Sequence, residues 1–111
     1  MDSNLEKIDG IFQSMKSAGW NTEKDLIWGF FFTAAAREPL AALLDELLPY
    51  KYSLESFEQR ENGRWVLQLA KREPLSSGEL HSRNLSFNDL AERHAVEYDG
   101  WDVSRTGGNQ D

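Results

Sequence analysis

The stretch that decides the fold is Leu26-Ile27-Trp28-Gly29-Phe30-Phe31-Phe32, which contains no charged residue. Successive side chains of a strand point to opposite faces. Ile27 and Phe31 therefore lie on one face, and Leu26, Trp28, Phe30 and Phe32 lie on the opposite face. A strand with one face in water alternates polar with apolar residues, and this stretch does not. We therefore expect a central strand of a sheet that is covered on both faces.

The overall composition limits the class of protein. The chain has 111 residues, a formal charge of −7 and no cysteine. This length fits one domain, and the lack of cysteine excludes disulfides and thiolate metal sites. We see no secretory signal at the start and no apolar segment long enough to span a membrane. We therefore expect a soluble cytoplasmic domain, with residues 1–104 folded and residues 105–111 forming a flexible tail.

The negative charge is concentrated near the C-terminus. Residues 85–111 contain six acids and two arginines, a net charge of −4. An acidic surface repels phosphate backbones and attracts basic molecules. The charge therefore disfavours direct nucleic-acid binding and favours a basic protein partner.

Three segments have helical patterns. Ser3-Asn4-Leu5-Glu6 has the form of a capping box, which predicts Ser3 as the N-cap of a helix that stops near Gly19. A second helix begins near Ala35 or Ala36, and Pro49 stops it. Ser76 or Ser77 caps a third helix. Its inner face is formed by Leu80, Asn84, Phe87, Leu90, Ala91 and His94. Since a buried amide needs partners, we expect Asn84 to bond to the backbone of a neighbouring loop.

Three further strands complete the predicted sheet. Residues 50–55 alternate apolar with polar, Asn62-Gly63 is a strong hairpin signal, and residues 65–70 return as an apolar strand. The last strand covers residues 95–103. The resulting order is that of an α+β, ferredoxin-like split βαβ sandwich, a four-stranded antiparallel sheet with two helices on one face. The extra N-terminal helix should cover the open face of the sheet or its edge.

Several functional classes find little support. Aromatic residues on two central strands of this fold can stack on RNA bases, but the acidic charge and the missing basic–aromatic motif favour core packing instead. Neither His81 nor His94 lies near a serine in a glycine-flanked turn, and the acids after His94 lack the ligand spacing of a cation loop. We therefore expect no enzyme, no cofactor and no metal.

The stretch Glu97-Tyr98-Asp99-Gly100-Trp101-Asp102 leaves two interpretations open. Asp99-Gly100 inside a strand indicates a bulge that re-aims Trp101. Aromatic residues beside acids can form a patch that docks a partner. Alternatively, Tyr98 and Trp101 close the core under the third helix, and the physical argument alone favours this second interpretation.

Residues 96–101, Val-Glu-Tyr-Asp-Gly-Trp, closely resemble the C-terminal signature of the RraB family, the regulators of ribonuclease E activity. The rest of the chain agrees with that family over roughly residues 3–104. It has an N-terminal helix, an aromatic strand, a leucine-rich helix and a tryptophan-bearing strand in the same order.

The resemblance implies a non-enzymatic protein that binds the C-terminal scaffold region of ribonuclease E and modulates RNA decay in the bacterial cytosol. An acidic domain meeting a basic partner agrees with the charge. The candidate partner-binding residues are Glu97, Tyr98, Asp99, Trp101 and Asp102, with Glu92 and Asp89 adding charge. Two alternatives remain. One is a small-molecule-binding regulatory domain with a pocket between the sheet and the first helix, and the other is an RNA-binding module.

Overall fold

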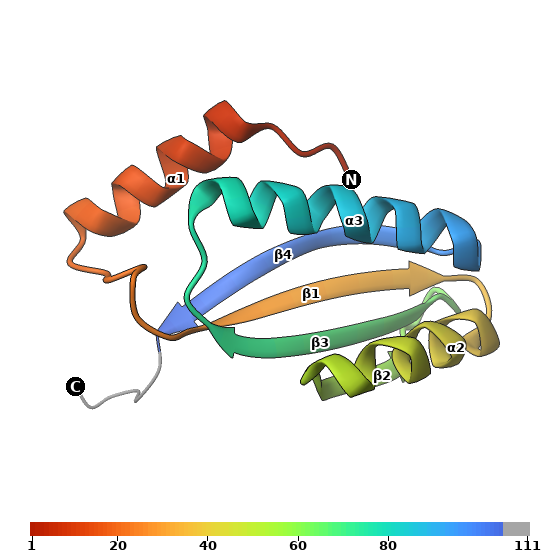
Figure 1. The fold of residues 1–111 in the computed structure, drawn as a ribbon. Helices are drawn as coiled ribbons and strands as arrows, with labels where there is room; N and C mark the ends of the chain where they lie inside the picture. The colour runs from red at the N-terminus through yellow and green to blue at the C-terminus, as the bar shows by residue number, and fades with distance from the viewer. Residues whose placement is uncertain (106–111) are drawn as a thin grey trace.

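The computed structural model describes residues 1–105 of the chain (Figure 1). In order, the elements are α1 (Leu5–Ser17), β1 (Leu26–Ala34), α2 (Arg37–Leu47), the 3₁₀ turn η1 (Leu48–Tyr50), β2 (Ser53–Gln59), β3 (Trp65–Glu73), α3 (Ser77–His94) and β4 (Glu97–Arg105). The strands form one antiparallel sheet in the order β2-β3-β1-β4, which confirms the ferredoxin-like α+β fold. Arg105, predicted to begin the flexible tail, is the last residue of β4, and residues 106–111 lie outside the described residues.

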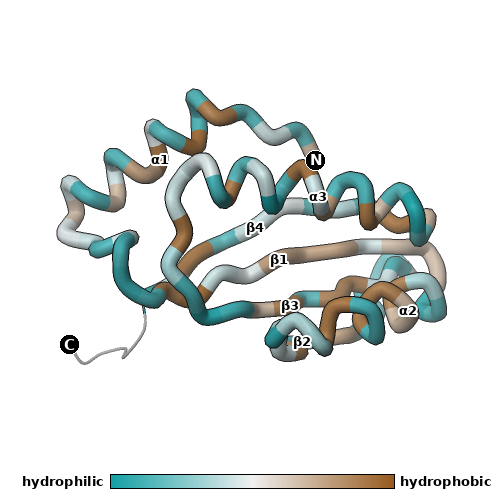
Figure 2. The backbone as a smooth tube through the Cα atoms, in the orientation of Figure 1, coloured by the Kyte–Doolittle hydropathy of each residue, from teal (hydrophilic) through white to brown (hydrophobic). Residues whose placement is uncertain are grey.

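Helices α2 and α3 pack on one face of the sheet, which we call the covered face (Figure 1). The centre of the hydrophobic core lies there. Trp28, Phe30 and Phe32 of β1 are fully buried. Phe87 of α3 meets Phe30 edge-on with ring centroids 5.0 Å apart, and it meets Phe32 at 5.4 Å. Figure 2 shows that α1 and α3 alternate between hydrophobic and hydrophilic residues along their length, as expected for helices with one buried side.

Helix α1 packs on this same covered face, beside α3 (Figure 1). Phe12 of α1 stacks on Trp28 with ring centroids 5.8 Å apart, and Trp28 shares its face of β1 with Phe30. Of the two places expected for the first helix, the open face is therefore wrong. The physical reason is that Trp28 extends the apolar row of β1, and α1 supplies the apolar contact that buries it.

The opposite face of the sheet has no helix over it within residues 1–105, and we call it the open face. Ile27 and Phe31 are half-buried there. The prediction that β1 is covered on both sides was therefore wrong. The neighbouring strands place polar side chains beside these two residues, since Gln68 pairs with Phe31 and Arg72 pairs with Ile27. Single apolar residues among polar neighbours are common on a protein surface, so the apolar run did not require a second layer.

The predictions for the ends of the helices and strands were partly correct. Asn4, not Ser3, caps α1, and its side chain accepts a bond from the Lys7 backbone N–H at 3.1 Å. At α3, Ser76 and Glu79 form the capping box. The hairpin predicted at Asn62-Gly63 joins β2 to β3. Strand β2 starts later than predicted, because Tyr50 belongs to η1, where it is 63% exposed.

Candidate protein-binding surface

The signature stretch lies in β4, an edge strand that pairs only with β1. Phe32 pairs with Tyr98 while Phe31 pairs with Gly100, so Asp99 is an extra residue and forms a bulge. Gly100 has a φ of +138°, a conformation that residues with side chains rarely adopt. The predicted bulge is confirmed. It places Tyr98 and Trp101, three residues apart, on the same covered face.

Tyr98 is a core residue, with 3% of its surface exposed. Its ring lies 5.1 Å from that of Phe32, and its hydroxyl donates a hydrogen bond of 2.6 Å to Oδ1 of Asn84. Burial raises the pKa of the Tyr98 hydroxyl far above its ordinary value. The structure thus places this predicted binding residue inside the molecule, where its side chain cannot meet a partner, because the bulge leaves it facing α3.

Asn84 is fully buried and connects Tyr98 to the N-terminal segment. Its Nδ2 donates to Oγ of Ser3 at 3.3 Å, and the same Oγ lies 2.7 Å from Nδ1 of His81. The partners of Asn84 are therefore side chains and not the loop backbone that we predicted. Ser3 is drawn into this chain of hydrogen bonds, which explains why Asn4 takes the capping position instead.

Trp101 is half-buried on the covered face. Its ring lies 5.9 Å from the ring of Trp28, the residue on which Phe12 stacks. Trp101 therefore helps to close the core beneath α1, in agreement with the second of the two interpretations. Only a part of its side chain is available to a partner.

The five acids of the predicted site are all exposed but do not form one cluster. Asp89 and Glu92 lie on α3, Asp99 lies at the bulge, and the pairing register puts Glu97 and Asp102 on the open face. Glu97 forms an ion pair with Arg64, whose guanidinium also donates to Oγ1 of Thr33 at 3.3 Å. The side chains of the other four acids have no hydrogen bond or ion pair within residues 1–105.

A groove of about 480 Å³ brings three of these acids together. It runs between α3 and the first half of β4, and its lining includes Glu92, Glu97 and Asp99. Asp89 and Asp102 lie outside it. The groove is thus lined by carboxylates from both elements, Glu92 from α3 and Glu97 and Asp99 from β4.

Gln68 is a residue of the open face that lies close to the predicted Asp102. Asp102 pairs with Gly29, and a Cβ on Gly29 would collide with the Asp102 carboxylate and lie 3.6 Å from Nε2 of Gln68. Gln68 was not among the predicted residues. The available signal was Gly29 itself, because a glycine in the middle of a strand often marks a close approach of another group.

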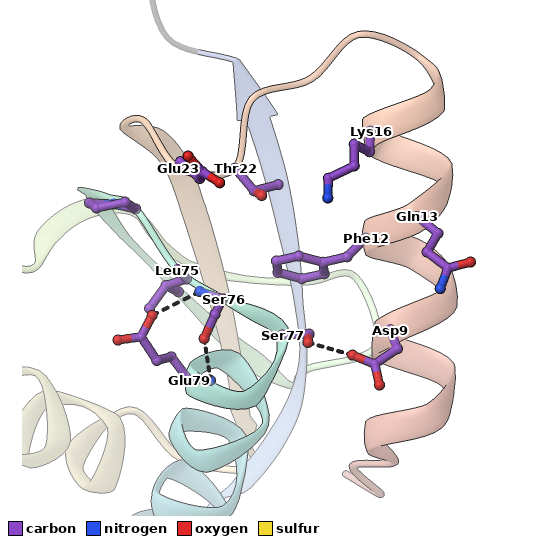
Figure 3. Close-up of a pocket in the computed structure, with 11 residues that line it drawn as sticks. Asp9, Phe12, Gln13, Lys16, Thr22, Glu23, Leu75, Ser76, Ser77 and Glu79 are labelled. Atoms are coloured by element: carbon purple, nitrogen blue, oxygen red, sulfur yellow. Dashed lines mark hydrogen bonds between the residues drawn. The ribbon is translucent and has the colours of Figure 1, made fainter.

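A second cavity, of about 560 Å³, lies between α1, the loop before β1 and the start of α3 (Figure 3). Phe12 and Lys16 line it from α1, and Glu23 lines it from the loop. At its floor, Asp9 accepts a hydrogen bond from the Ser77 hydroxyl, and Glu79 accepts one of 2.8 Å from the Ser76 backbone N–H. That bond lowers the pKa of Glu79, because it favours the charged carboxylate.

In the part of the chain from 1 to 105, no three histidine, aspartate or glutamate side chains are grouped closely enough to hold a metal ion. Among the same residues, no helix combines the length and the apolar character that crossing a membrane requires.

Comparison with known proteins assigns the chain to a family. A search of the curated proteins finds no significant match. The family model RraB, described as regulator of ribonuclease activity B, matches residues 6–103. This match covers nearly the whole chain, including every helix and strand of the fold at least in large part. The chain therefore belongs to the RraB family.

Proposed function

We propose that this protein regulates ribonuclease activity without catalysis of its own, by binding a basic protein partner in the bacterial cytoplasm. Ribonuclease E, through its C-terminal scaffold region, is the partner that we expect. The description of the family supports the regulatory role, and the net charge of −7 supports a basic partner. Opposite charges on two proteins accelerate their association and help to select the right partner.

The observation that carries this proposal is the set of exposed acids around β4. The side chains of Asp89, Glu92, Asp99 and Asp102 are exposed and make no ion pair within the described part of the chain. Charges that stabilise a fold are usually paired, whereas these are free to meet a partner. Asp89 and Glu92 lie on α3, and Asp99 and Asp102 lie on the edge strand β4.

Direct binding to RNA is not part of the proposal. Protein groups that bind phosphates are mostly lysine and arginine side chains, and RNA-binding domains carry them in a basic patch. Of the aromatic residues considered for stacking on bases, Trp28, Phe30 and Phe32 are fully buried on the covered face, and Trp65 is half-buried. We therefore expect no shift of a labelled RNA even at low salt.

The test is a binding measurement with purified scaffold fragments of ribonuclease E. The double variant Asp99→Lys/Asp102→Lys changes the net charge by four units, and Glu38→Lys/Asp45→Lys makes the same change on exposed positions of α2. We expect the first variant to bind at least about tenfold more weakly, with a shallower salt dependence, and the second to bind almost as the wild type does. Equal losses in both variants would show that net charge, and not this surface, controls binding. An unchanged affinity of the first variant would refute the surface.

The second cavity favours a different function, the binding of a small regulatory molecule. Its volume of about 560 Å³ is in the range of small-molecule sites. Two of its acids, Asp9 and Glu79, are however already bonded to Ser77 and Ser76, which ties them to the docking of α1 and the capping of α3. Thermal unfolding with a metabolite library tests this function. A ligand that raises the melting temperature of the wild type but not of Phe12→Ala would favour it over protein binding.

A further inference from the structure

The open face carries a polar site at its centre, over Gly29. Gly29 lies in the middle of β1, between Ile27 and Phe31, and pairs with Asp102 on one side and Ala70 on the other. A Cβ at this position would collide with Oδ1 of Asp102 and lie 3.2 Å from its Cγ. The carboxylate of Asp102 therefore lies directly over the backbone of Gly29, in space that any other residue would fill.

Gln68 reaches the same place from the other side. It is on β3, opposite Phe31, and its Nε2 would lie 3.6 Å from a Cβ on Gly29. Neither Asp102 nor Gln68 has a side-chain hydrogen bond or an ion pair within residues 1–105. A carboxylate and an amide thus converge over a glycine with their hydrogen-bonding capacity unused.

The charges of the open face indicate what this site attracts. Two cations of this face are matched by carboxylates, Arg64 by Glu97 and Arg72 by Asp25. Asp102 and Glu58 are carboxylates of this face that have no ion pair within residues 1–105. Glu58 lies on this face because it pairs with Val66, which in turn pairs with Thr33. The unpaired carboxylate of Asp102 therefore favours a cation at the site over Gly29.

We propose that the Asp102–Gly29–Gln68 site binds the guanidinium group of an arginine from the protein partner. This inference rests on the proposed function and names the chemistry by which the partner is recognised. A guanidinium presents several N–H donors in one plane, which suits the Asp102 carboxylate. The Gln68 amide, whose Nε2 faces Gly29 here, would turn over so that its oxygen accepts beside that carboxylate. The half-buried ring of Phe31, two residues along the same face, offers a surface for stacking. Lysine has neither the planar fork nor the stacking surface and should bind more weakly.

The variant Gly29→Ala changes the position of the Asp102 carboxylate without changing its charge. Its Cβ occupies the space of the Asp102 carboxylate while the charge of the protein stays the same. The obstacle is the end of a flexible side chain, so the carboxylate moves aside and the strand can form. Asp102→Asn provides the opposite change, since it removes the charge and keeps the shape. Glu58→Gln is the matched control, because it removes a free carboxylate elsewhere on the same face.

The experiment is a titration of the full chain with N-acetylarginine amide, followed by two-dimensional amide NMR, with N-acetyllysine amide in parallel. We expect arginine to shift the amide signals of Gly29, Phe31, Gln68 and Asp102, and lysine to do so more weakly. Gly29→Ala and Asp102→Asn should each weaken arginine binding about tenfold, whereas Glu58→Gln should not. Shifts confined to other residues, no shift at all, or an unchanged affinity of both site variants would overturn the proposal.

A second measurement distinguishes this inference from the proposed function. The same variants are tested for binding to the ribonuclease E scaffold fragments. If the wild type binds and both site variants bind equally well, the arginine site is refuted while the proposed function stands. If no form binds the fragments but the arginine titration still maps to the site, the proposed partner is wrong and the guanidinium site stands.

Discussion

The two faces of the sheet differ in what they contribute to the protein. On the covered face, β1 presents Trp28, Phe30 and Phe32, all fully buried under helices. On the open face, the same strand presents Ile27, Gly29 and Phe31, next to side chains that are polar and in part unpaired. Adjacent residues of one strand therefore lie in opposite surroundings, one set buried and the other partly exposed.

The side chains of the family signature and of Asp102, which follows it, are divided between these two faces. Tyr98 and Trp101 point to the covered face and close the core, while Glu97 and Asp102 point to the open face. The bulge at Asp99 makes this division possible, because it lets two aromatic residues three positions apart share one face. The aromatic half of the signature maintains the fold, and we assign recognition to its acidic half.

The largest effect should come from a substitution that contrasts the two faces directly. Phe30→Ala removes a fully buried ring that packs against Phe87 and should lower the free energy of unfolding by about 3–5 kcal/mol. Phe31→Ala, at the next residue, should cost less than half as much, because its ring is only half-buried. Urea denaturation followed by tryptophan fluorescence gives both values. Equal losses would show that the open face is as tightly packed as the covered one.

A smaller effect is expected in the hydrogen-bond chain of the covered face. Asn84→Ala leaves the buried Tyr98 hydroxyl without its acceptor and should cost about 1–3 kcal/mol. Asn88 lies one turn further along α3, where its amide donates to the backbone carbonyl of Met1 at an exposed position. Asn88→Ala is therefore the control and should cost well under that amount. If the two variants unfold alike, the network does not contribute to stability in the way that its burial indicates.

Alkaline pH should lower the stability of the protein through ionisation of Tyr98. The folded-state pKa of Tyr98 is raised above its ordinary value of 10.0 by burial, so its stabilisation is complete below that pH and is lost as the pH rises further. The stability of the wild type should therefore fall more steeply than that of Tyr98→Phe above about pH 10. Tyr52, whose pKa is also raised by burial, remains in both proteins and cancels in the difference. Parallel curves from about pH 8 to about pH 11 would contradict the assignment.

The smallest effect on stability should come from the open face. Asp102→Asn changes an exposed side chain without an ion pair and should alter the free energy of unfolding by no more than about 0.5 kcal/mol. The same substitution should weaken partner and arginine binding about tenfold. Thermal melting of the sample used for binding checks both. A large loss of stability would mean that Asp102 belongs to the fold rather than to recognition.

Much of this fold could be read from local patterns. The apolar run around Trp28 and the leucine stripe of α2 identified their elements, because burial requires apolar residues at the spacing of a strand or a helix. The Asn62-Gly63 turn and the Asp99-Gly100 bulge were identified because few backbone conformations suit those pairs. The acidic C-terminal region, with exposed Asp89, Glu92, Asp99 and Asp102, could also be read directly.

What the sequence by itself determined was the identity and order of the elements, together with the positions that need glycine or an apolar side chain. Only the tertiary structure decided that α1 joins α3 on the covered face, and that the second side of β1 stays open. It also decided that the Tyr98 hydroxyl donates to Asn84, and that the side chains of Asp102 and Gln68 both lie close to Gly29. The physical reason is that the local sequence pattern predicts whether a side chain is buried. It does not predict which side chain will contact it, because the contacting residue comes from a distant part of the chain.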